Sequence, residues 1–367
     1  MEKAYKFRIY PNEKQEQLMQ RIFGCCRFVY NYYLALRTEK YEKEGVTFNY
    51  NACSADLTAL KKELSWLCET DSTALQSSLK DLEAAYRNFF RGRKTGEDIG
   101  FPNFKSKRTA RKSYISKAKI VVLDGCVKLP KLGKVKCRVS RPVEGRILNA
   151  TVSQEPSGKY FVSLCCTDVE VPQYESTGKA VGIDLGLKEL AITSDGETFV
   201  NPKPLHKAEK KLARLQRQLS RKSKGSANRR KARIKVARFH EKVANQRRDA
   251  LHKLTTKLVE KYDLIAIETL RPANMVKNRR LAKSISDASW GELVRQLEYK
   301  MAWQHKVLVK VDPFFASSQT CHVCGEKNPA TKNLTVRSWL CEGCGATHDR
   351  DHNAAINILQ EGLRLVS

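Results

Sequence analysis

Two Cys-x-x-Cys pairs near the C-terminal end constrain the fold of this chain more than any other feature. Sixteen residues separate the first pair from the second, and the four residues are Cys321, Cys324, Cys341 and Cys344. In each pair, two sulfur atoms of one tight turn can face a single ion. The spacing is that of a four-thiolate zinc site rather than of redox pairs or free thiols. Four sulfur ligands leave no open position for water, so we predict a structural rather than a catalytic zinc ion.

The charge of the chain predicts a polyanionic partner. Its 367 residues include 68 Lys and Arg against 39 Asp and Glu, a net charge of +29. Such an excess is hard to keep on a compact protein unless a polyanion neutralises it, which indicates nucleic acid. A basic membrane-surface protein is the alternative. It needs an apolar anchor, and no apolar run approaches the about 18–20 residues of a spanning helix, so we expect no membrane partner.

The N-terminal segment and the remaining cysteines indicate a reducing compartment. Residues 1–10 carry Lys3, Lys6 and Arg8 among apolar residues, which argues against a signal peptide. Buried free thiols are the best explanation for the eight cysteines outside the two pairs. These are Cys25, Cys26, Cys53, Cys68, Cys126, Cys137, Cys165 and Cys166. We expect a cytoplasmic protein of two to three modules.

The N-terminal half predicts a small antiparallel barrel with helices inserted into it. Residues 4–10 alternate as a strand does, Pro11 ends the strand, and Asn12 can cap a helix. A second helical run begins near Ser72. After a basic loop come short alternating segments with turn signals between them, at 120–123, 134–139, 148–152 and 159–164. The N-terminal strand is expected to complete the barrel.

The second helical run offers candidate DNA contacts. It carries a leucine and aromatic stripe that we assign to the core, and its opposite face presents Gln76, Ser77 and Lys80. Glutamine is chemically suited to adenine, and lysine to guanine or phosphate. The alternative is that these side chains are simply solvated.

The C-terminal half alternates strands and helices, which predicts an α/β sheet. Strands are expected at 180–184, 189–193, 264–267 and 307–311, and helices at 290–302 and 352–363. Between them, residues 207–248 form a basic helical hairpin with a break at 223–226. Its many like charges repel one another unless a phosphate backbone lies against them, so the hairpin is a candidate nucleic-acid surface.

Three acids lie at the ends of these elements. Asp184 and Glu268 each end an apolar strand, and Asp351 opens the last helix. Proteins with an α/β sheet commonly place their ligand-binding or catalytic site at the carboxyl ends of the strands. Burying an ionised acid there costs free energy unless it is paired or bound to a cation. Three converging carboxylates repel one another unless Mg²⁺ or Mn²⁺ holds them ionised, and a pair of such ions suits phosphodiester hydrolysis. Taken singly, each acid is equally well a turn former, a salt-bridge partner or a helix cap.

Longer motifs around these residues resemble those of the TnpB family, the transposon-encoded RNA-guided DNA nucleases related to type V CRISPR effectors. Four motifs carry the resemblance: GIDLG (182–186), IAIETL (265–270), SSQTCHVCG (317–325) and CEGCGATHDRDHNAAINI (341–358). Three further segments also look like the family: KAYKFRIYPN (3–12), FPNFKSK (101–107) and SWGELVRQLEYKM (289–301). The resemblance therefore covers nearly the whole chain.

The resemblance implies a catalytic site of the family's kind. It assigns the three catalytic, metal-binding acids to Asp184, Glu268 and Asp351. Asp349 is the rival of Asp351, which we favour because it abuts the helix and occupies the family's position for this acid. Thr269 departs from the family, which often has a second acid there, and we expect no effect on metal binding. None of the three acids is replaced, so nothing suggests the nuclease-dead relatives that act as repressors.

The resemblance also implies a multidomain α/β fold. A RuvC-like nuclease domain of the ribonuclease-H fold, with an inserted zinc ribbon, follows an N-terminal β-barrel (wedge) domain that carries a helical recognition domain. The expected limits are 1–10 and 113–175 for the barrel, 11–112 for the helical domain, 178–316 and 346–367 for the nuclease domain, and 317–345 for the ribbon.

The implied function is RNA-guided cleavage of double-stranded DNA beside a short motif that the protein reads. A guide RNA and a displaced strand both need cationic channels, which accounts for the charge. Besides the three helix residues above, the expected contacts are Lys105, Lys107, Arg108, Arg111, Lys112, Arg221, Lys222, Arg229, Arg230, Lys277, Arg279 and Arg280. We expect a prokaryotic, nucleoid-associated protein that is a monomer, with a dimer as the alternative.

Other functions remain open on the sequence alone. A guide-RNA-bound regulator or repressor has the same fold without cleavage, and a CRISPR-associated effector shares the same nuclease. A transposase that joins DNA ends uses similar acids, but it has less use for the zinc ribbon. The intact acids favour the nuclease.

Overall fold

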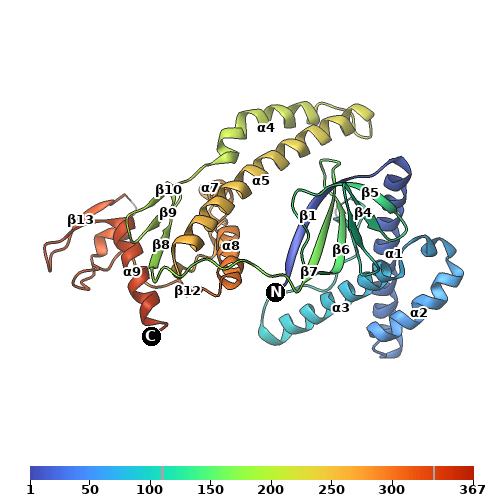
Figure 1. The fold of residues 1–367 in the computed structure, drawn as a ribbon, viewed down its shortest axis with the longest axis horizontal. Helices are drawn as coiled ribbons and strands as arrows, with labels where there is room; N and C mark the ends of the chain where they lie inside the picture. Colours follow the sequence, from blue (N-terminus) through green and yellow to red (C-terminus); the bar gives the residue numbers. More distant parts are fainter. Residues whose placement is uncertain (109–110, 334) are drawn as a thin grey trace. The chain divides into compact units, whose positions relative to one another are not determined.

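The computed structural model describes residues 1–108, 111–333 and 335–367. The chain divides into two compact units, Met1–Glu170 and Val171–Ser367 (Figure 1). Among the described residues, no helix is long and apolar enough to cross a membrane.

The first unit combines an antiparallel sheet with a group of helices. Its elements are β1 (Lys3–Tyr10), α1 (Glu13–Glu44), α2 (Tyr50–Glu63), η1 (Ser65–Glu69), α3 (Ser72–Thr95), β2 (Lys112–Ser116), β3 (Val121–Leu123), β4 (Cys126–Leu129), β5 (Gly133–Arg138), β6 (Arg146–Gln154) and β7 (Tyr160–Thr167). The strand order is β2-β6-β7-β1-β5-β4-β3. The N-terminal strand therefore lies inside the sheet, as the sequence predicts.

The barrel predicted for this unit is not closed by hydrogen bonds. Strands β2 and β3 lie at the two ends of the order, and no strand pair among the described residues joins them. Strand β3 has only three residues and pairs with β4 alone, so it offers a short edge. The antiparallel sheet is confirmed, while its closure is not.

Local sequence explains the elements of this unit. Residues Tyr5, Phe7 and Ile9 of β1 are buried and alternate with exposed neighbours, as in a strand with one face on a core. Asn12 caps α1 in a capping box with Gln15, whose backbone N–H donates to the Asn12 side chain. The buried residues of the helices and of the sheet form one continuous core.

The second unit is built on a mixed sheet. Its elements are β8 (Ala180–Leu185), β9 (Glu189–Thr193), β10 (Thr198–Val200), α4 (Pro204–Ser220), α5 (Ala227–Lys261), β11 (Leu264–Glu268), α6 (Pro272–Met275), α7 (Ala282–Ala288), α8 (Trp290–Trp303), β12 (Val307–Val311), η2 (Pro329–Lys332), β13 (Ser338–Leu340), β14 (Thr347–Asp349) and α9 (Arg350–Arg364). The order is β10-β9-β8-β11-β12, with β8, β11 and β12 parallel and the β8–β9–β10 meander antiparallel.

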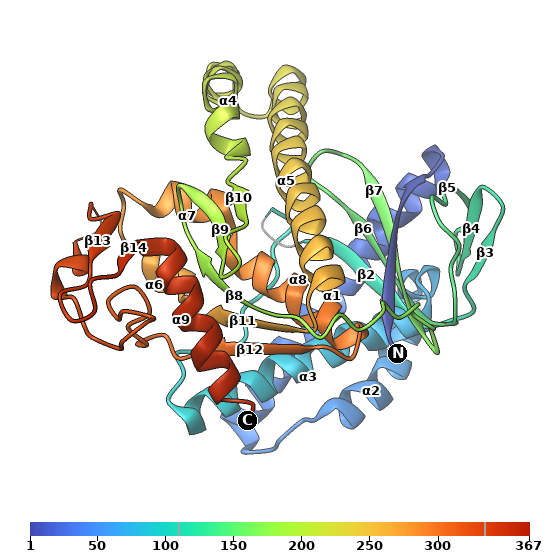
Figure 2. The same ribbon diagram turned by 60° about the vertical axis from the view of Figure 1, so that its left-hand side comes forward.

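The two faces of this sheet are covered by different helices. Val181, Ile183 and Ile265 pack with apolar residues of α5 and α8 on one face. Gly182 and Ala266, which alternate with them along the strands, face α9 on the other (Figure 2). An added Cβ at Gly182 would lie 2.0 Å from the Ala355 carbonyl oxygen, so only glycine permits this close approach of helix and strand.

None of the cysteines, all of which lie among the described residues, forms a disulfide, as predicted for the eight outside the two Cys-x-x-Cys pairs. Outside the two Cys-x-x-Cys pairs, five of them are buried, whereas Cys126 and Cys165 are half-buried and Cys68 is exposed. Burial of all eight is therefore wrong. Cys68 lies in the short 3-10 helix η1, next to the buried Leu67.

Candidate active site and metal site

Strand alternation places two of the predicted acids on the same face of the sheet. Gly182 and Ala266 face α9, and the residues two positions further along the strands are Asp184 and Glu268. Strands β8 and β11 are parallel neighbours, so their carboxyl ends meet at one edge. Asp351 lies in the first turn of α9, the helix that covers this face. The three acids therefore converge from three elements.

Burial and mutual repulsion change how these acids ionise. Burial raises the pKa of Asp184 well above its usual value, and the carboxyls of Glu268 and Asp351 raise it further. Burial raises the pKa of Glu268 to about 7, although its Oε1 accepts a 2.9 Å hydrogen bond from the Leu185 backbone N–H, which lowers it. Without a bound cation, ionisation of all three carboxyl groups at this edge of the sheet is therefore unfavourable.

Asp351 and Asp349 have different roles in the structure. The Asp349 side chain is the N-cap of α9 and accepts from the backbone N–H groups of Asp351 and His352, at 3.1 and 2.9 Å. The Asp351 carboxylate instead contacts the Arg337 guanidinium at 3.1 Å, and its charge raises the pKa of Asp184. Arg337 is not predicted from the sequence, because nothing in its local pattern points to this partner.

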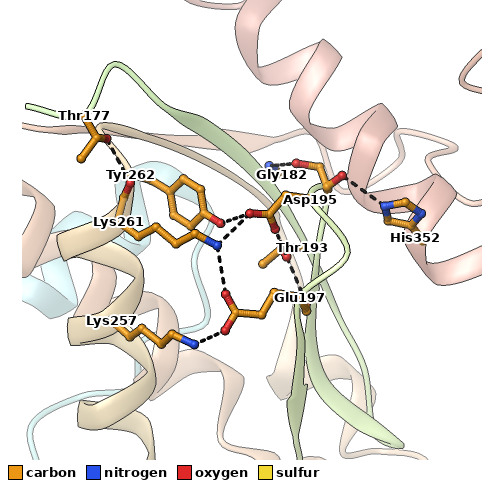
Figure 3. A network of polar contacts seen from close by, with 10 residues as sticks. Thr177, Gly182, Thr193, Asp195, Glu197, Lys257, Lys261, Tyr262 and His352 are labelled. Atoms are coloured by element: carbon orange, nitrogen blue, oxygen red, sulfur yellow. Dashed lines mark hydrogen bonds and ion pairs between the residues drawn. The ribbon is translucent and has the colours of Figure 1, made fainter.

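Contacts with the β8–β9 region fix the first turn of α9. His352 Nε2 donates to the Ser194 carbonyl oxygen at 3.1 Å. The Ser194 hydroxyl accepts from the Gly182 backbone N–H at 3.0 Å, and the Ser194 N–H donates to the Gly182 carbonyl at 2.9 Å. Figure 3 shows His352 on α9 beside this turn and Gly182 close by. The turn that follows β9 therefore ties the helix of Asp351 to the strand of Asp184.

A second part of the same network attaches the turn to the end of α5. Asp195 accepts from Lys261 at 2.9 Å and from the Tyr262 hydroxyl, and Glu197 accepts from Lys257 and Lys261 (Figure 3). Burial opposes ionisation of Asp195, but the hydrogen bonds from Lys261, Thr193 and Tyr262 together outweigh it and hold the pKa of Asp195 below its usual range. These contacts join the turn after β9 to the end of α5 and so stabilise the sheet that carries the acids.

The four cysteines form a metal-binding cluster. Among the described residues, they are the one group of three or more His, Cys, Asp and Glu side chains whose ligand atoms all lie within 4.8 Å of one another. Gly325 (φ 80°) and Gly345 (φ 72°) follow the two pairs in the left-handed region, as tight knuckles require. His348 Nε2 lies 3.1 Å from Cys321 Sγ, where an N–H group supports a thiolate.

The ribbon of this cluster is bonded directly to α9. The Asn353 side-chain oxygen accepts from the backbone N–H of His322, and the Asn353 and Asn357 amides donate to the Thr320 carbonyl at 2.8 and 2.6 Å. Asn353 lies two residues after Asp351 in the same helix. The four-cysteine cluster thus holds the helix that carries one of the acids.

The residues of α3 only partly match the predicted polar face. Gln76 and Lys80 are exposed, as predicted. Ser77 is buried, and its hydroxyl donates to the Thr73 carbonyl at 2.7 Å, so its placement on an exposed face is wrong. Its helix packs on both α1 and β2, so the covered face is wider than the leucine stripe indicates.

The basic loop at 105–112 includes residues 109–110, which lie outside the described residues. Lys105 is half-buried: its Nζ lies 3.8 Å from Asp81, and burial lowers its pKa. Lys112 donates to Gln20 and Gln154, and Arg111 lies 3.6 Å from Glu155. Lys107 and Arg108 are exposed. Much of the basic charge of this loop is therefore engaged within the first unit.

The basic hairpin is formed by α4 and α5, as predicted, with the break at residues 221–226. Arg221, Lys222 and Arg230 are exposed near its tip. Arg229 instead donates to the Leu219 and Lys222 carbonyl oxygens at 3.0 and 2.8 Å, which ties the turn together. The remaining predicted contacts, Lys277, Arg279 and Arg280, are exposed after α6.

Three family descriptions match segments of this chain. They are "Probable transposase" of the OrfB_IS605 type over residues 163–279, the "Cas12f1-like, TNB domain" over 290–358, and a "Helix-turn-helix domain" of OrfB_IS605 over 1–45. In the last segment the structure shows strand β1 and the single long helix α1.

Relatives match nearly the full length of the chain. A Streptomyces pristinaespiralis protein named "Putative RNA-guided DNA endonuclease" is 43% identical over 99% of this chain and 90% of its own. An Escherichia coli (strain K12) protein of the same name, InsQ, is 38% identical over 98% and 92%. A TnpB-like protein, MJ1635, of Methanocaldococcus jannaschii is 26% identical over 52% of this chain and 44% of its own.

Solved structures share the fold. The Cas12f1 chain of a complex with guide RNA and target DNA aligns with a TM-score of 0.56 at 14% identity, over 98% of both chains. The mini RNA-guided endonuclease Cas-phi3 aligns with a TM-score of 0.53 at 10% identity, over 99% of this chain and 92% of its own. Carboxylates that raise one another's pKa at the ends of parallel strands, beside a four-cysteine cluster, are the arrangement of a metal-binding α/β protein. Within that class, the chain belongs to the TnpB family.

Proposed function

We propose that this protein is an RNA-guided DNA endonuclease that hydrolyses phosphodiester bonds with Asp184, Glu268 and Asp351. The observation that carries the proposal is the convergence of these three acids, whose burial and mutual repulsion raise the pKa values of Asp184 and Glu268. A protein gains nothing in stability from such an arrangement, so it indicates a site selected for its chemistry. Membership of the TnpB family supports the substrate class.

The donor sets suit two different metals. Oxygen ligands alone, with excess negative charge, suit Mg²⁺ or Mn²⁺ at the acids. Four thiolates suit a structural Zn²⁺ at the cysteine cluster. When bound, a pair of divalent ions would stabilise the attacking and leaving oxygens of an in-line hydrolysis.

The protein's own groups prepare that site. The Leu185 N–H orients the Glu268 carboxylate, and the Asp349 cap fixes the turn that presents Asp351. Arg337 neutralises part of the Asp351 charge, at 3.1 Å from its carboxylate. Asp184, Glu268 and Asp351 would hold the divalent ions, and Arg337 would have to leave the Asp351 carboxylate for that carboxylate to bind one.

The order β10-β9-β8-β11-β12, an antiparallel meander followed by parallel strands, supports a RuvC-like domain of the ribonuclease-H fold. We propose the nuclease domain at 178–316 and 346–367 and the zinc ribbon at 317–345. The first unit would contain the wedge sheet (1–10 and 113–175) and the recognition helices (11–112). The exposed cations supply a path for guide RNA and target DNA.

The partners follow from this assignment. A net charge of +29 supports a protein that carries its guide RNA bound and meets DNA in the nucleoid of a prokaryotic cell. We propose a monomer as the working form. Gln76 and Lys80 remain the proposed readers of the short motif beside the target.

The test is the cleavage of target DNA by the complex with the co-purified RNA. Asp184→Ala should abolish cutting, while the affinities for guide RNA and DNA stay nearly unchanged. A variant that still cuts at the parental rate would show that the site is assigned wrongly. If the wild-type complex binds its target but never cuts with Mg²⁺ or Mn²⁺ present, the protein is instead a guided repressor.

A further inference from the structure

Phe314 is the most exposed large hydrophobic residue of the described chain, with 85% of its surface open. It lies three residues beyond Val311, the last residue of β12. In the register of the sheet, Val311 is the partner of Glu268 on the neighbouring strand β11. Phe314 therefore stands at the edge of the sheet where the acids converge.

The loop that carries Phe314 is held at both ends. The Phe314 backbone N–H donates to the Asp312 carboxylate at 2.8 Å, and the next residue, Phe315, packs into the core under α9. At the far end, the Ser317 carbonyl accepts from the Asn357 amide of α9 at 2.8 Å. The exposed ring is thus presented by a loop fixed to the elements that carry Glu268 and Asp351.

A cation lies beside this ring. The Arg271 guanidinium carbon lies 6.0 Å from the centre of the Phe314 ring, within the range of a cation–π contact. Arg271 lies three residues beyond Glu268. The segment 271–280 contains four cations and no acid: Arg271, Lys277, Arg279 and Arg280. A flat apolar surface in a cationic setting suits a strand that offers both bases and phosphates.

We propose that Phe314 and Arg271 form a nucleobase-binding site for the DNA strand that enters the active site. The Phe314 ring stacks on one unpaired base, and Arg271 contacts the ring and the adjoining phosphate. This inference rests on the proposed nuclease function and identifies two side chains that bind its DNA substrate. An apolar peptide is a poorer occupant, because it leaves the cations of the segment unpaired.

Stacking on one base should strengthen binding of the strand without changing the chemical step. Each stacked base contributes about 1–3 kcal/mol by alanine substitution, so its loss corresponds to about tenfold weaker binding or more. Because the contact is the same in the ground state and the transition state, KM should rise while kcat stays constant. Guide-RNA affinity should not change.

The experiment measures cleavage by the protein–guide RNA complex over a range of DNA concentrations. Phe314→Ala should raise KM about tenfold with kcat unchanged, and Phe314→Trp should restore the wild-type KM. Phe90→Ala is the matched control, since Phe90 is another exposed phenylalanine (56%) on α3 of the other unit. Its KM should equal that of the wild type. Equal KM values for Phe314→Ala and the wild type would overturn the proposal.

A second readout does not depend on cutting. In the Asp184→Ala background, 2-aminopurine placed beside the mapped cut position should be quenched on binding, and Phe314→Ala should remove this quenching. Quenching that persists in the double variant would overturn the stacking site even if the wild type cuts DNA. A loss of guide-RNA affinity in Phe314→Ala would likewise overturn it, because the ring would then stack on RNA.

Discussion

Glu268 shows how strongly one side chain at this site depends on its surroundings. Its Oε1 is bonded to the Leu185 N–H, which favours the ionised form, yet burial raises its pKa to about 7. The cost of burial therefore exceeds the gain from the hydrogen bond. A bound cation reverses the balance, because it stabilises the ionised carboxylate directly.

This shift predicts a pH-dependent cost to stability when no Mg²⁺ or Mn²⁺ is present. The folded-state pKa of Glu268, about 7, lies above its ordinary value of 4.5, so the folded protein binds this proton more tightly than the unfolded chain. The cost is absent below pH 4.5, grows as the pH rises to 7, and is complete above it, at about 3 kcal/mol. Glu268→Gln keeps an oxygen acceptor for Leu185 and removes the cost.

We therefore expect the wild type to lose more stability than Glu268→Gln between pH 5 and pH 8. The measurement is urea unfolding at each pH in buffer that leaves zinc in place. Adding Mg²⁺ at pH 8 should stabilise the wild type and leave Glu268→Gln nearly unchanged. If the stability curves of the two proteins run parallel over this range, Glu268 is not the buried acid described above.

Helix α9 and strand β8 determine how closely the acids approach. An added Cβ at Gly182 would lie 2.0 Å from the Ala355 carbonyl and 2.5 Å from the Leu359 backbone nitrogen. Both of these are backbone atoms, so the helix itself must move. Asp351 would move with it, away from Asp184.

Gly182→Ala should therefore abolish DNA cleavage and lower the melting temperature by several degrees, because overpacking costs about 1–3 kcal/mol. Gly291→Ala in α8 is the matched control. It has no atom within 4 Å of its added Cβ, and alanine favours a helix. This control should keep full activity and should melt at the same temperature or slightly higher. A fully active Gly182→Ala protein would contradict the packing described here.

The proposed zinc ribbon contacts the same helix through the Thr320 carbonyl. Because metal binding in such a ribbon is folding energy, Cys344→Ser should unfold it and release the Asn353 and Asn357 contacts with Thr320. We expect a lower melting temperature and loss of cleavage with guide-RNA binding retained. Calorimetry with and without a strong chelator checks this, and equal melting temperatures in the two samples would show that the cluster holds no structural metal.

The sequence predicts this site only in part, for physical reasons. An apolar run followed by an acid indicates a buried strand end, so Asp184 and Glu268 could be found by local pattern. The salt bridge from Arg337 and the contact of His352 with Ser194 join residues 14 and 158 positions apart, and no local pattern encodes such pairs. Strand β2 begins at Lys112, the last residue of the basic segment expected to be a loop, and the local charge hid its start.

At the scale of the whole molecule, the question is which of the many cations are available to bind nucleic acid. Of the cations predicted to contact nucleic acid, some are engaged within the fold: Lys105 lies beside Asp81, and Arg229 ties the tip of the hairpin. Others, such as Arg221, Lys222 and Arg230, are exposed at that tip. Only the exposed group is free to replace counterions on a phosphate backbone, so only this group should determine how salt weakens binding.

We expect the triple variant with Arg221, Lys222 and Arg230 changed to Gln to bind guide RNA more weakly and with a smaller salt dependence. Each lost phosphate contact should reduce the slope of log K against log salt by about 0.7–0.9, measured by filter binding at several salt concentrations. The control removes the same formal charge at Lys43, Arg295 and Arg364, each of which pairs with an acid on its own helix outside the hairpin. Its slope should match the wild type. If both triple variants lose the same slope, the net charge of the protein holds the RNA, and the hairpin has no special part in binding it.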